Sequence, residues 1–291
     1  MGRGDVEATD RAGASAMRRT FESIAINGVI VLGDSDSDLL PIGAKVGNET
    51  GPELDVAVDP LEGAAICAIG GYNAMSIVAI AERGGFLKIP DMYMEKIAVG
   101  PEGRGAISLE RSATDNLKAL ADAKRVYVAD LTVAILERPR HEGLIAEVRE
   151  AGARVKLLRD GDVAAAVATT DPASGIDMLL GTGGSKQGIM TAAALRCAAG
   201  DMQARLKARN PDELEKARAL GIDDLDKIYA IDEMASGSVM FAGTGVTNGD
   251  YLRGVRFFRG GGTTNSVVMR SRTHTIRFLR SNHRFDLKPE Y

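Results

Sequence analysis

"LDVAVDPLEGAA", residues 54–65, is an apolar run that ends in carboxylates and a turn. The run from Leu54 to Val58 predicts a buried strand. Pro60 then stiffens the backbone, and Gly63 lets the chain turn back. Outward from this stretch, strands are expected at 28–32, 74–81, 131–136, 155–158, 178–180 and 239–242, and helices at 12–24, 141–151, 163–168, 188–199 and 211–220. This alternation predicts a layered α/β fold.

The same stretch carries a candidate metal site. Asp59 and Glu62 leave the end of the predicted strand on either side of a Pro-containing turn. The carbonyl of Leu61 between them can supply a third oxygen. Hard oxygen ligands of this kind suit Mg²⁺ or Mn²⁺.

A second acidic stretch, "VIVLGDSDSDLLP" at residues 29–41, places Asp34, Asp36 and Asp38 at every second position. Carboxylates this close repel one another unless a cation compensates them, so a divalent ion is one explanation. A solvated acidic loop is the alternative. The spacing is not that of an EF-hand, because Leu39 stands where the turn needs Gly and Lys45 where the bidentate Glu belongs.

Two further strand ends carry polar groups. "VKLLRDGDVAAAV" at 155–167 presents Asp160 and Asp162 around Gly161, and "MLLGTGGSKQGIM" at 178–190 presents several glycines with Lys186 before a helix. Gly-rich turns that open helices expose backbone N–H groups to anions. We therefore expect a phosphate or sugar-phosphate cradle here, although the spacing is not that of a P-loop.

Composition limits the class of protein. The chain has 291 residues, 45% hydrophobic and 26% charged, which indicates a globular protein. Its net charge of -4 argues against a general nucleic-acid binder. Cys67 and Cys197 are expected to be buried reduced thiols. No apolar stretch is long enough to cross a bilayer, and the start has no signal-peptide core, so we expect a cytoplasmic protein without a membrane partner.

The segment 116–129 is polar and Ala-rich, and the alternation restarts after it with "LTVAIL" at 131–136. This change predicts a boundary near Val128. The first lobe, 1–128, would then bind metal, and the second, 129–291, would bind substrate.

Taken together, these motifs closely resemble the class II fructose-1,6-bisphosphatases, a branch of the lithium-sensitive, metal-dependent sugar phosphatase superfamily. The resemblance covers nearly the whole chain. It rests on GRGD followed by Asp10, VDPLEG, PDMYMEK, GPEGRG, ERPRHE, RDGDVAAA, GTGG, GTGVTNGDYL and SRTHTIR. It implies a layered αβαβα sugar-phosphatase fold of two lobes with the site at their junction, and a homo-oligomer is expected from the resemblance alone.

The resemblance also implies site residues, to which we add those indicated by the acidic stretches. The metal ligands are Asp10, Asp34, Asp59, Leu61, Glu62 and Gln187, and the catalytic carboxylates are Asp34, Asp36, Asp59 and Glu62. The substrate contacts are Glu62, Gly63, Ala64, Tyr93, Arg138, Pro139, Arg140, Asp160, Gly161, Asp162, Gly184 and Gln187. The two arginines suit a phosphate, and the aspartates can accept sugar hydroxyls.

Structural roles are the alternatives for several of these residues. Tyr93 could be a core aromatic, and Arg138 and Arg140 could pair with Glu137 or Glu142 on a surface. The cationic segment toward the C-terminus is expected to be the exposed face of a strand, with nucleic-acid binding as the less favoured interpretation; its members are Arg270, Arg272, Arg277 and Arg280. The three histidines, His141, His274 and His283, are expected to be structural.

The sequence departs from the family pattern at three places. Gly33 is followed by Asp34, Ser35 and Asp36, where the family has G-E-G-E with longer side chains. Ala64 replaces a Thr whose hydroxyl helps to orient and deprotonate the attacking water. Gln187 replaces a Glu, which removes one negative charge.

We expect hydrolysis of the 1-phosphate of fructose 1,6-bisphosphate, with a Mg²⁺ or Mn²⁺ cofactor. The alternatives are a different sugar phosphate, such as sedoheptulose 1,7-bisphosphate or a specialised-pathway sugar, and a sugar-phosphate-binding protein that has lost catalysis.

Overall fold

The computed structural model describes residues 1–33 and 38–287 and divides into two compact units, each with its own β-sheet. Unit 1 is formed by residues 1–86 and 237–291, from both ends of the chain, and unit 2 by residues 87–236. The predicted boundary at 128 falls inside unit 2, which runs from residue 87 to residue 236. The chain then returns to the first sheet. The prediction of a mixed α/β protein is confirmed.

Unit 1 is built on an eight-stranded sheet in the order β12-β13-β11-β4-β3-β1-β2, with β14 along the other edge of β13. Strands β1 and β3 are parallel, whereas β4 runs antiparallel to both β3 and β11. Its elements are α1 (Val6–Phe21), β1 (Asn27–Leu32), β2 (Lys45–Val46), β3 (Glu53–Glu62), α2 (Ala64–Ala68), β4 (Met75–Glu82), β11 (Val239–Gly245), β12 (Arg256–Phe258), β13 (Gly261–Arg270), β14 (Thr275–Arg284) and a 3₁₀ turn, η5 (Phe285–Leu287).

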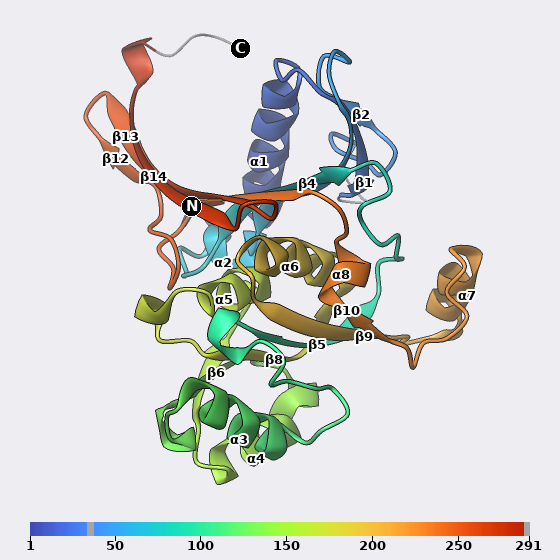
Figure 1. The fold of residues 1–291 in the computed structure, drawn as a ribbon. Coiled ribbons are helices and arrows are strands. Elements are labelled where there is room, and N and C mark those ends of the chain that lie inside the picture. Colours follow the sequence, from blue (N-terminus) through green and yellow to red (C-terminus); the bar gives the residue numbers. More distant parts are fainter. Residues whose placement is uncertain (34–37, 288–291) are drawn as a thin grey trace. The chain divides into compact units, whose positions relative to one another are not determined.

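Helix α1 lies across this sheet and packs against β3 and α2 (Figure 1). Asp5 caps its first turn by accepting a 2.9 Å hydrogen bond from the N–H of Ala8. Ala14 and Phe21 are buried in a cluster with Val56 and Val58 of β3. These contacts place the helix over the strand that carries Asp59 and Glu62.

Unit 2 is built on a six-stranded sheet in the order β10-β9-β5-β8-β6-β7. Its strands are β5 (Tyr93–Val99), β6 (Thr132–Leu136), β7 (Arg154–Leu158), β8 (Met178–Gly184), β9 (Asp201–Lys207) and β10 (Ile228–Ala230). Its helices are η1 (Pro101–Gly103), α3 (Ala113–Lys124), η2 (Val128–Asp130), η3 (Pro139–His141), α4 (Glu142–Glu150), α5 (Asp162–Ala168), η4 (Pro172–Ser174), α6 (Ser185–Cys197), α7 (Pro211–Ala219) and α8 (Ile231–Met234).

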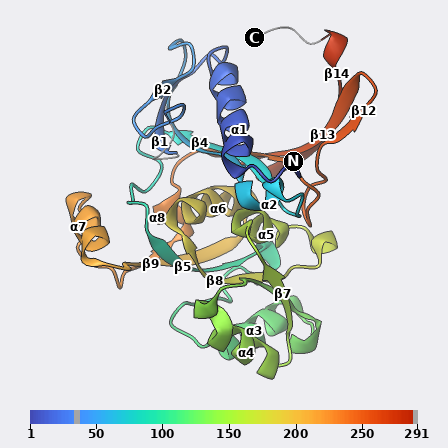
Figure 2. The same ribbon diagram turned by 180° about the vertical axis from the view of Figure 1, so that it is seen from behind.

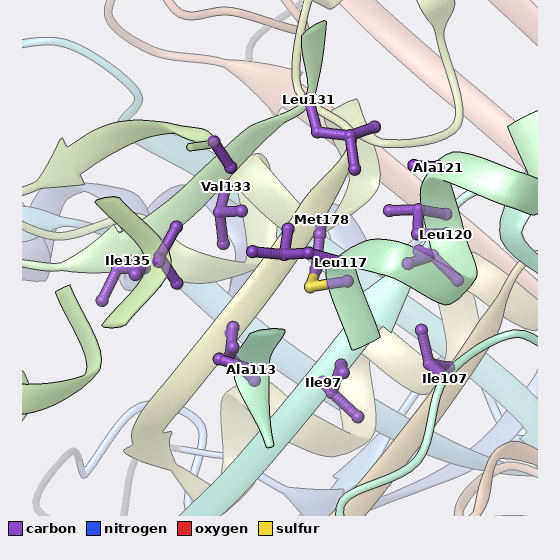
Figure 3. Packing of buried hydrophobic residues seen from close by; sticks show 14 residues of the cluster. Ile97, Ile107, Ala113, Leu117, Leu120, Ala121, Leu131, Val133, Ile135 and Met178 are labelled. Atoms are coloured by element: carbon purple, nitrogen blue, oxygen red, sulfur yellow. The ribbon is translucent and has the colours of Figure 1, made fainter. Parts of the chain in front are cut away.

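Helices cover both faces of the second sheet. In Figures 1 and 2, α3 and α4 lie on one side, α5 and α6 on the other, and α7 stands away at the end of β9. The core on the α3 side is formed by apolar residues of α3 and of the strands beneath it, as Figure 3 shows for Leu117, Leu120, Ile97, Val133 and Met178. Unit 2 is therefore a three-layer α/β unit.

The observed elements differ from the predicted ones in three respects. The first helix begins at Val6 rather than residue 12, and β3 continues as a strand through Pro60 to Glu62 instead of turning. Strands β5 and β9 and helix α3 were not predicted, and the single strand expected over the C-terminal arginines is a pair of strands, β13 and β14. The segment 116–129, interpreted as a boundary, includes most of α3, which packs into the core of unit 2.

Candidate functional site

A β-bulge at the end of β3 brings Asp59 and Glu62 to one face of the sheet. Asp59 pairs with Ile77 of β4 and Glu62 with Met75, so three steps on β3 oppose two on β4. Residues three apart on a regular strand point to opposite faces of the sheet. The extra residue in the bulge brings the side chains of Asp59 and Glu62 back to the same face. Pro60 lies inside the bulge, where a missing N–H costs no ladder hydrogen bond.

Both carboxylates are largely withdrawn from solvent. Asp59 is 6% exposed and Glu62 is 3% exposed. Two carboxylates on one face of a buried strand end repel each other, and a cation or hydrogen-bond donors must offset this.

Helix α1 approaches the bulge at Gly13. A β-carbon at Gly13 would stand 3.0 Å from the carbonyl oxygen of Pro60, so the helix backbone lies directly on the bulge. Asp10 precedes Gly13 by three residues and therefore shares its face of the helix. The structure thus places predicted ligand Asp10 on the helix face that meets β3.

The chain turns sharply after Glu62. Gly63 adopts φ +81°, in the left-handed region, and its own β-carbon position would stand 2.8 Å from the side chain of Ile66. Ala64 then begins the short helix α2 and is half-buried. Ala64 therefore directly follows the bulge and its turn.

The acidic stretch at residues 34–37 lies outside the described residues, and Asp34 and Asp36 with it. Asp38, which is described, is exposed. Within residues 1–33 and 38–287, no three His, Cys, Asp or Glu side chains come close enough together to form a metal site. A complete ligand set on Asp10, Asp59 and Glu62 alone is therefore absent, and the metal-ligand assignments stay predictions.

The groups at the bulge nevertheless fit a hard divalent cation. They are two carboxylates and the backbone carbonyl of Leu61, which are the oxygen donors that Mg²⁺ and Mn²⁺ prefer. The burial of Asp59 and Glu62 makes an uncompensated pair of charges costly. The donor chemistry and the burial both support a bound cation at this strand end.

In unit 2, two guanidinium groups lie over the ring of Tyr93, the first residue of β5. The Cζ of Arg140 lies 4.5 Å from the ring centroid and that of Arg209 lies 4.4 Å from it. Arg140 also donates hydrogen bonds of 3.2 and 2.7 Å from Nε and Nη2 to the carbonyl of Thr182. The alternative of a core aromatic therefore does not describe Tyr93, which is half-buried beneath two cations.

Arg209 is held from its other side by Glu213, in the first turn of α7. Its Nε donates to Glu213 Oε1 at 2.6 Å, and its backbone N–H donates to Oε2 at 2.8 Å. Hydrogen bonds from Arg209 lower the pKa of Glu213, and the pKa of Arg209 is raised by the same partner. Tyr93, Arg140 and Arg209 thus form a preorganised cationic surface.

The loop that carries Arg138, Pro139 and Arg140 is anchored to the sheet. Arg138 donates hydrogen bonds to the carbonyls of Glu137, at 2.9 Å, and Arg159, at 2.8 Å. Both predicted phosphate-binding arginines thus donate to backbone carbonyls, in place of the alternative of surface pairs with Glu137 or Glu142.

His141 holds the end of this loop. Its buried ring donates from Nδ1 to the carbonyl of Leu136, at 2.7 Å, and accepts at Nε2 the N–H of Thr182, at 2.8 Å. Burial lowers the pKa of His141, with Arg140 and Arg138 acting in the same direction. The neutral imidazole therefore fixes the arginine loop to β8, and the structural role expected for this histidine is confirmed.

Two pockets border the arginine loop. One, of about 430 Å³, is lined by Arg138, Pro139 and residues of α4 and β7. The other, of about 280 Å³, is lined by Arg140, Thr182, the start of α3 and Arg111, which precedes that helix. Arg138 and Arg140 each have solvent-accessible space beside them.

The two aspartates of the 160–162 turn differ in their burial and in their partners. Asp160 is half-buried and accepts the N–H of Gly161 at 3.1 Å. Asp162, the first residue of α5, is 5% exposed and forms an ion pair with Lys96, which is itself 1% exposed. Gly161 adopts φ +82°, which lets the chain turn between them.

The glycine-rich segment before α6 is strand rather than turn, which corrects the predicted anion cradle. Residues 181–184 are the last four of β8, and α6 begins at Ser185. A β-carbon at Gly183 would stand 2.5 Å from Asp162 Oδ2 and 2.9 Å from Lys96 Nζ, so close packing explains this glycine. Gln187, the predicted amide ligand, folds back, and its Oε1 would stand 2.2 Å from a β-carbon at Gly184.

Lys96 and Arg209 were not among the site residues expected from the sequence. The signal for Arg209 is the alternation of basic residues in "QARLKAR", since β9 pairs in register with β5 and Lys207 lies opposite Tyr93. The signal for Lys96 is a single charge in the otherwise apolar second half of "YMEKIAV". Both signals depend on recognising β5 as a strand.

Other predictions can be compared directly with the structure. Cys67 and Cys197 are buried, as expected. The cationic segment toward the C-terminus is exposed on β13, β14 and the turn between them, as expected for Arg270, Arg272, Arg277 and Arg280. His283 contacts the Oγ1 of Thr264 at 2.9 Å. Over the described part of the chain, every helix is too short or too polar to span a bilayer.

Comparison with known proteins shows the family of the chain. The family model for bacterial fructose-1,6-bisphosphatase, glpX-encoded, matches residues 1–283. A D-fructose 1,6-bisphosphatase class 2/sedoheptulose 1,7-bisphosphatase of Thermosynechococcus vestitus is 39% identical over 318 aligned positions, covering 98% of this chain and 91% of that protein. A protein of the same description from Synechococcus sp. (strain JA-2-3B'a(2-13)) is 39% identical over 315 positions, covering 98% of this chain and 90% of the relative. The chain therefore belongs to the class II fructose-1,6-bisphosphatase family of hydrolases.

Proposed function

We propose that this protein is a divalent-metal-dependent phosphatase that hydrolyses the 1-phosphate of fructose 1,6-bisphosphate to fructose 6-phosphate and phosphate. The observation that carries the proposal is the bulge in β3, which sets Asp59 and Glu62 on one buried face in a chain of this family. The finer fold assignment, a layered αβαβα arrangement in two lobes, is part of the same proposal.

Asp59, Glu62 and the carbonyl of Leu61 would hold Mg²⁺ or Mn²⁺, with Asp10, Asp34 and Gln187 as the remaining ligands. A divalent ion in such a site lowers the pKa of a bound water and offsets the charge of the phosphate. With Ala64 in place of Thr, we propose that Asp36 or Asp38 takes the proton from the attacking water.

The residues of unit 2 bind and orient the sugar phosphate. Arg138 and Arg140 suit a phosphate because guanidinium groups donate two parallel hydrogen bonds to it. Arg140 is already held by Tyr93 and Thr182, so little conformational entropy is lost when an anion binds. Arg209, on the same ring, adds positive charge at this surface.

The test is phosphate release from fructose 1,6-bisphosphate with Mg²⁺ or Mn²⁺, using Asp59→Asn protein purified in parallel as the contamination control. We expect metal-dependent release that is lost in the variant, because one ligand charge is removed from the site. Equal release by both proteins would show that the activity is a contaminant or that the site lies elsewhere.

A second substrate, sedoheptulose 1,7-bisphosphate, is favoured by the description of both relatives. The rebuilt acidic stretch, in which Asp34 and Asp36 replace the longer glutamates, is a further reason to test it. A comparison of kcat/KM for the two bisphosphates decides between them. If neither is hydrolysed but fructose 6-phosphate still binds, the protein has kept sugar-phosphate binding without catalysis.

A further inference from the structure

Lys96 is a buried cation in the middle of the second sheet. It lies on β5, in register with Gly181 of β8 and Ala204 of β9. Only 1% of the residue is exposed, and its aliphatic chain runs beside Gly188 of α6, where a β-carbon would stand 3.4 Å from Lys96 Cδ. A buried ammonium group is costly unless it is paired and hydrogen-bonded.

The ammonium group joins three segments that carry predicted substrate contacts. It forms an ion pair with Asp162 at the start of α5, and it donates a 3.2 Å hydrogen bond to the carbonyl of Gly184 at the end of β8. Its own strand begins with Tyr93. A side chain at Gly183 would collide with both charged groups, so the packing around the pair leaves no spare room.

These contacts separate the roles of the two aspartates in the 160–162 turn. The Oδ2 atom of Asp162 is engaged by Lys96, and the carboxylate is 7% exposed. Asp160 lies at the other end of the turn and is more exposed. A side chain this buried offers little surface to a sugar hydroxyl, and any movement of the carboxylate toward the sugar would weaken its pairing with the lysine charge.

We infer that Lys96 is a positioning residue of the sugar-phosphate site and that Asp162 serves as its partner, which leaves Asp160 as the acceptor for the sugar. The ion pair holds the 160–162 turn against the end of β8, so that Asp160 and Gly184 keep a fixed spacing. The identity of the ligand in this inference rests on the proposed function. The contact that Lys96 makes between the 160–162 turn and the end of β8 does not.

Three variants test it: Lys96→Met, Asp162→Asn and the double variant Lys96→Met/Asp162→Asn, each titrated with fructose 6-phosphate by calorimetry. Each single change strands one buried polar or charged group, so we expect affinity to fall about tenfold or more. The double variant carries an uncharged pair of similar shape and should recover to within about threefold of the unchanged protein. If it binds as weakly as Asp162→Asn, then Asp162 contacts the sugar itself and the inference is wrong.

A matched control is Lys124→Met, which removes another lysine of unit 2 that pairs with an aspartate, Asp177, at 2.6 Å. Lys124 lies at the end of α3, away from the predicted substrate contacts. We expect its loss to leave fructose 6-phosphate affinity unchanged. An equal loss in both lysine variants would assign the effect to general destabilisation and overturn a positioning role.

Amide hydrogen exchange tests, without any ligand, whether Lys96 holds the 160–162 turn against the end of β8. In Lys96→Met, amide exchange should rise in peptides covering 160–163 and 183–187 and stay unchanged in those covering α1. Unchanged exchange in both segments would overturn the inference. If the unchanged protein binds no sugar phosphate, the proposed function fails, and the exchange result alone then decides whether Lys96 holds the two segments together.

Discussion

Ala64 stands at the first position of α2, directly after the turn at Gly63. In the class II pattern this position carries a Thr whose hydroxyl orients the attacking water. We predict that Ala64→Thr raises kcat at least tenfold, since assistance by a positioned proton acceptor contributes about 10²–10⁴-fold. Ala64→Val is the matched control, because it has the same branched shape without the hydroxyl. Equal rates for both variants would mean that another group has taken over this role.

The buried His141 should make the free energy of unfolding depend on pH. Burial holds the pKa of the folded His141 below its ordinary value, so the unfolded chain binds a proton more readily than the folded one. Its neutral form therefore contributes stability above about pH 6.5, which is lost as the pH falls toward the folded pKa. Urea unfolding at pH 7.5 and pH 5.5 should show this loss, and His141→Gln should have a smaller pH dependence. If the free energy of unfolding of His141→Gln depends on pH as strongly as that of the unchanged protein, His141 is not the group responsible.

At the level of secondary-structure elements, the contact of α1 with the bulge in β3 can be tested through two helical glycines. Gly→Ala in a helix normally stabilises by about 1 kcal/mol. At Gly143 of α4 nothing lies within 4 Å of a new β-carbon, so Gly143→Ala should show this gain. At Gly13 the β-carbon would meet the carbonyl of Pro60 at 3.0 Å, so Gly13→Ala should show no gain or a loss. Thermal unfolding of both variants measures the difference, and an equal gain would show that α1 moves freely over the bulge.

The bulge also shows which parts of the site the sequence could predict. "VDPLEG" indicated carboxylates beside Pro60 at a strand end, and both carboxylates are there. Sequence alone does not reveal that the strand continues through Pro60, because the bulge depends on the register with β4. Arg209 and Lys96 were missed for a related reason. Their roles follow from the pairing of β9 and β8 with β5, a contact between segments distant in sequence.

For the whole molecule, the composition of unit 1 from both chain ends leads to a truncation prediction. Strand β4 pairs with β11 along seven residues, Met75–Ala81 against Val239–Gly245. A chain that ends at residue 236 would leave this edge open in the middle of the sheet. We expect it to aggregate or to lose cooperative unfolding of unit 1, as measured by solubility and circular dichroism. The control is a chain that ends at Arg284, which keeps every strand of the sheet and should unfold cooperatively.

Fold class could be predicted from alternation alone, but the division of the chain could not. A boundary at a single point of the sequence assumes contiguous domains, and the boundary near Val128 is expected because the strand and helix alternation restarts after the polar, Ala-rich segment 116–129. That stretch includes most of α3, whose apolar face, with Leu117 and Leu120, is buried on β5 and β6. The return of residues 237–291 to the first sheet has no local signal, because it depends on long-range pairing.

The order of strands in unit 1 also has a consequence for biosynthesis. A ribosome releases β3 and β4 early, whereas β11, which pairs with β4, emerges only after all of unit 2 has been made. Unit 2 is continuous in the chain and can fold as soon as it leaves the exit tunnel. The strand β4, which pairs with Asp59 and Glu62 of β3, therefore keeps an open edge until translation reaches Val239. We expect this open edge to make the nascent chain depend on chaperones, because an unpaired strand edge can associate with other chains.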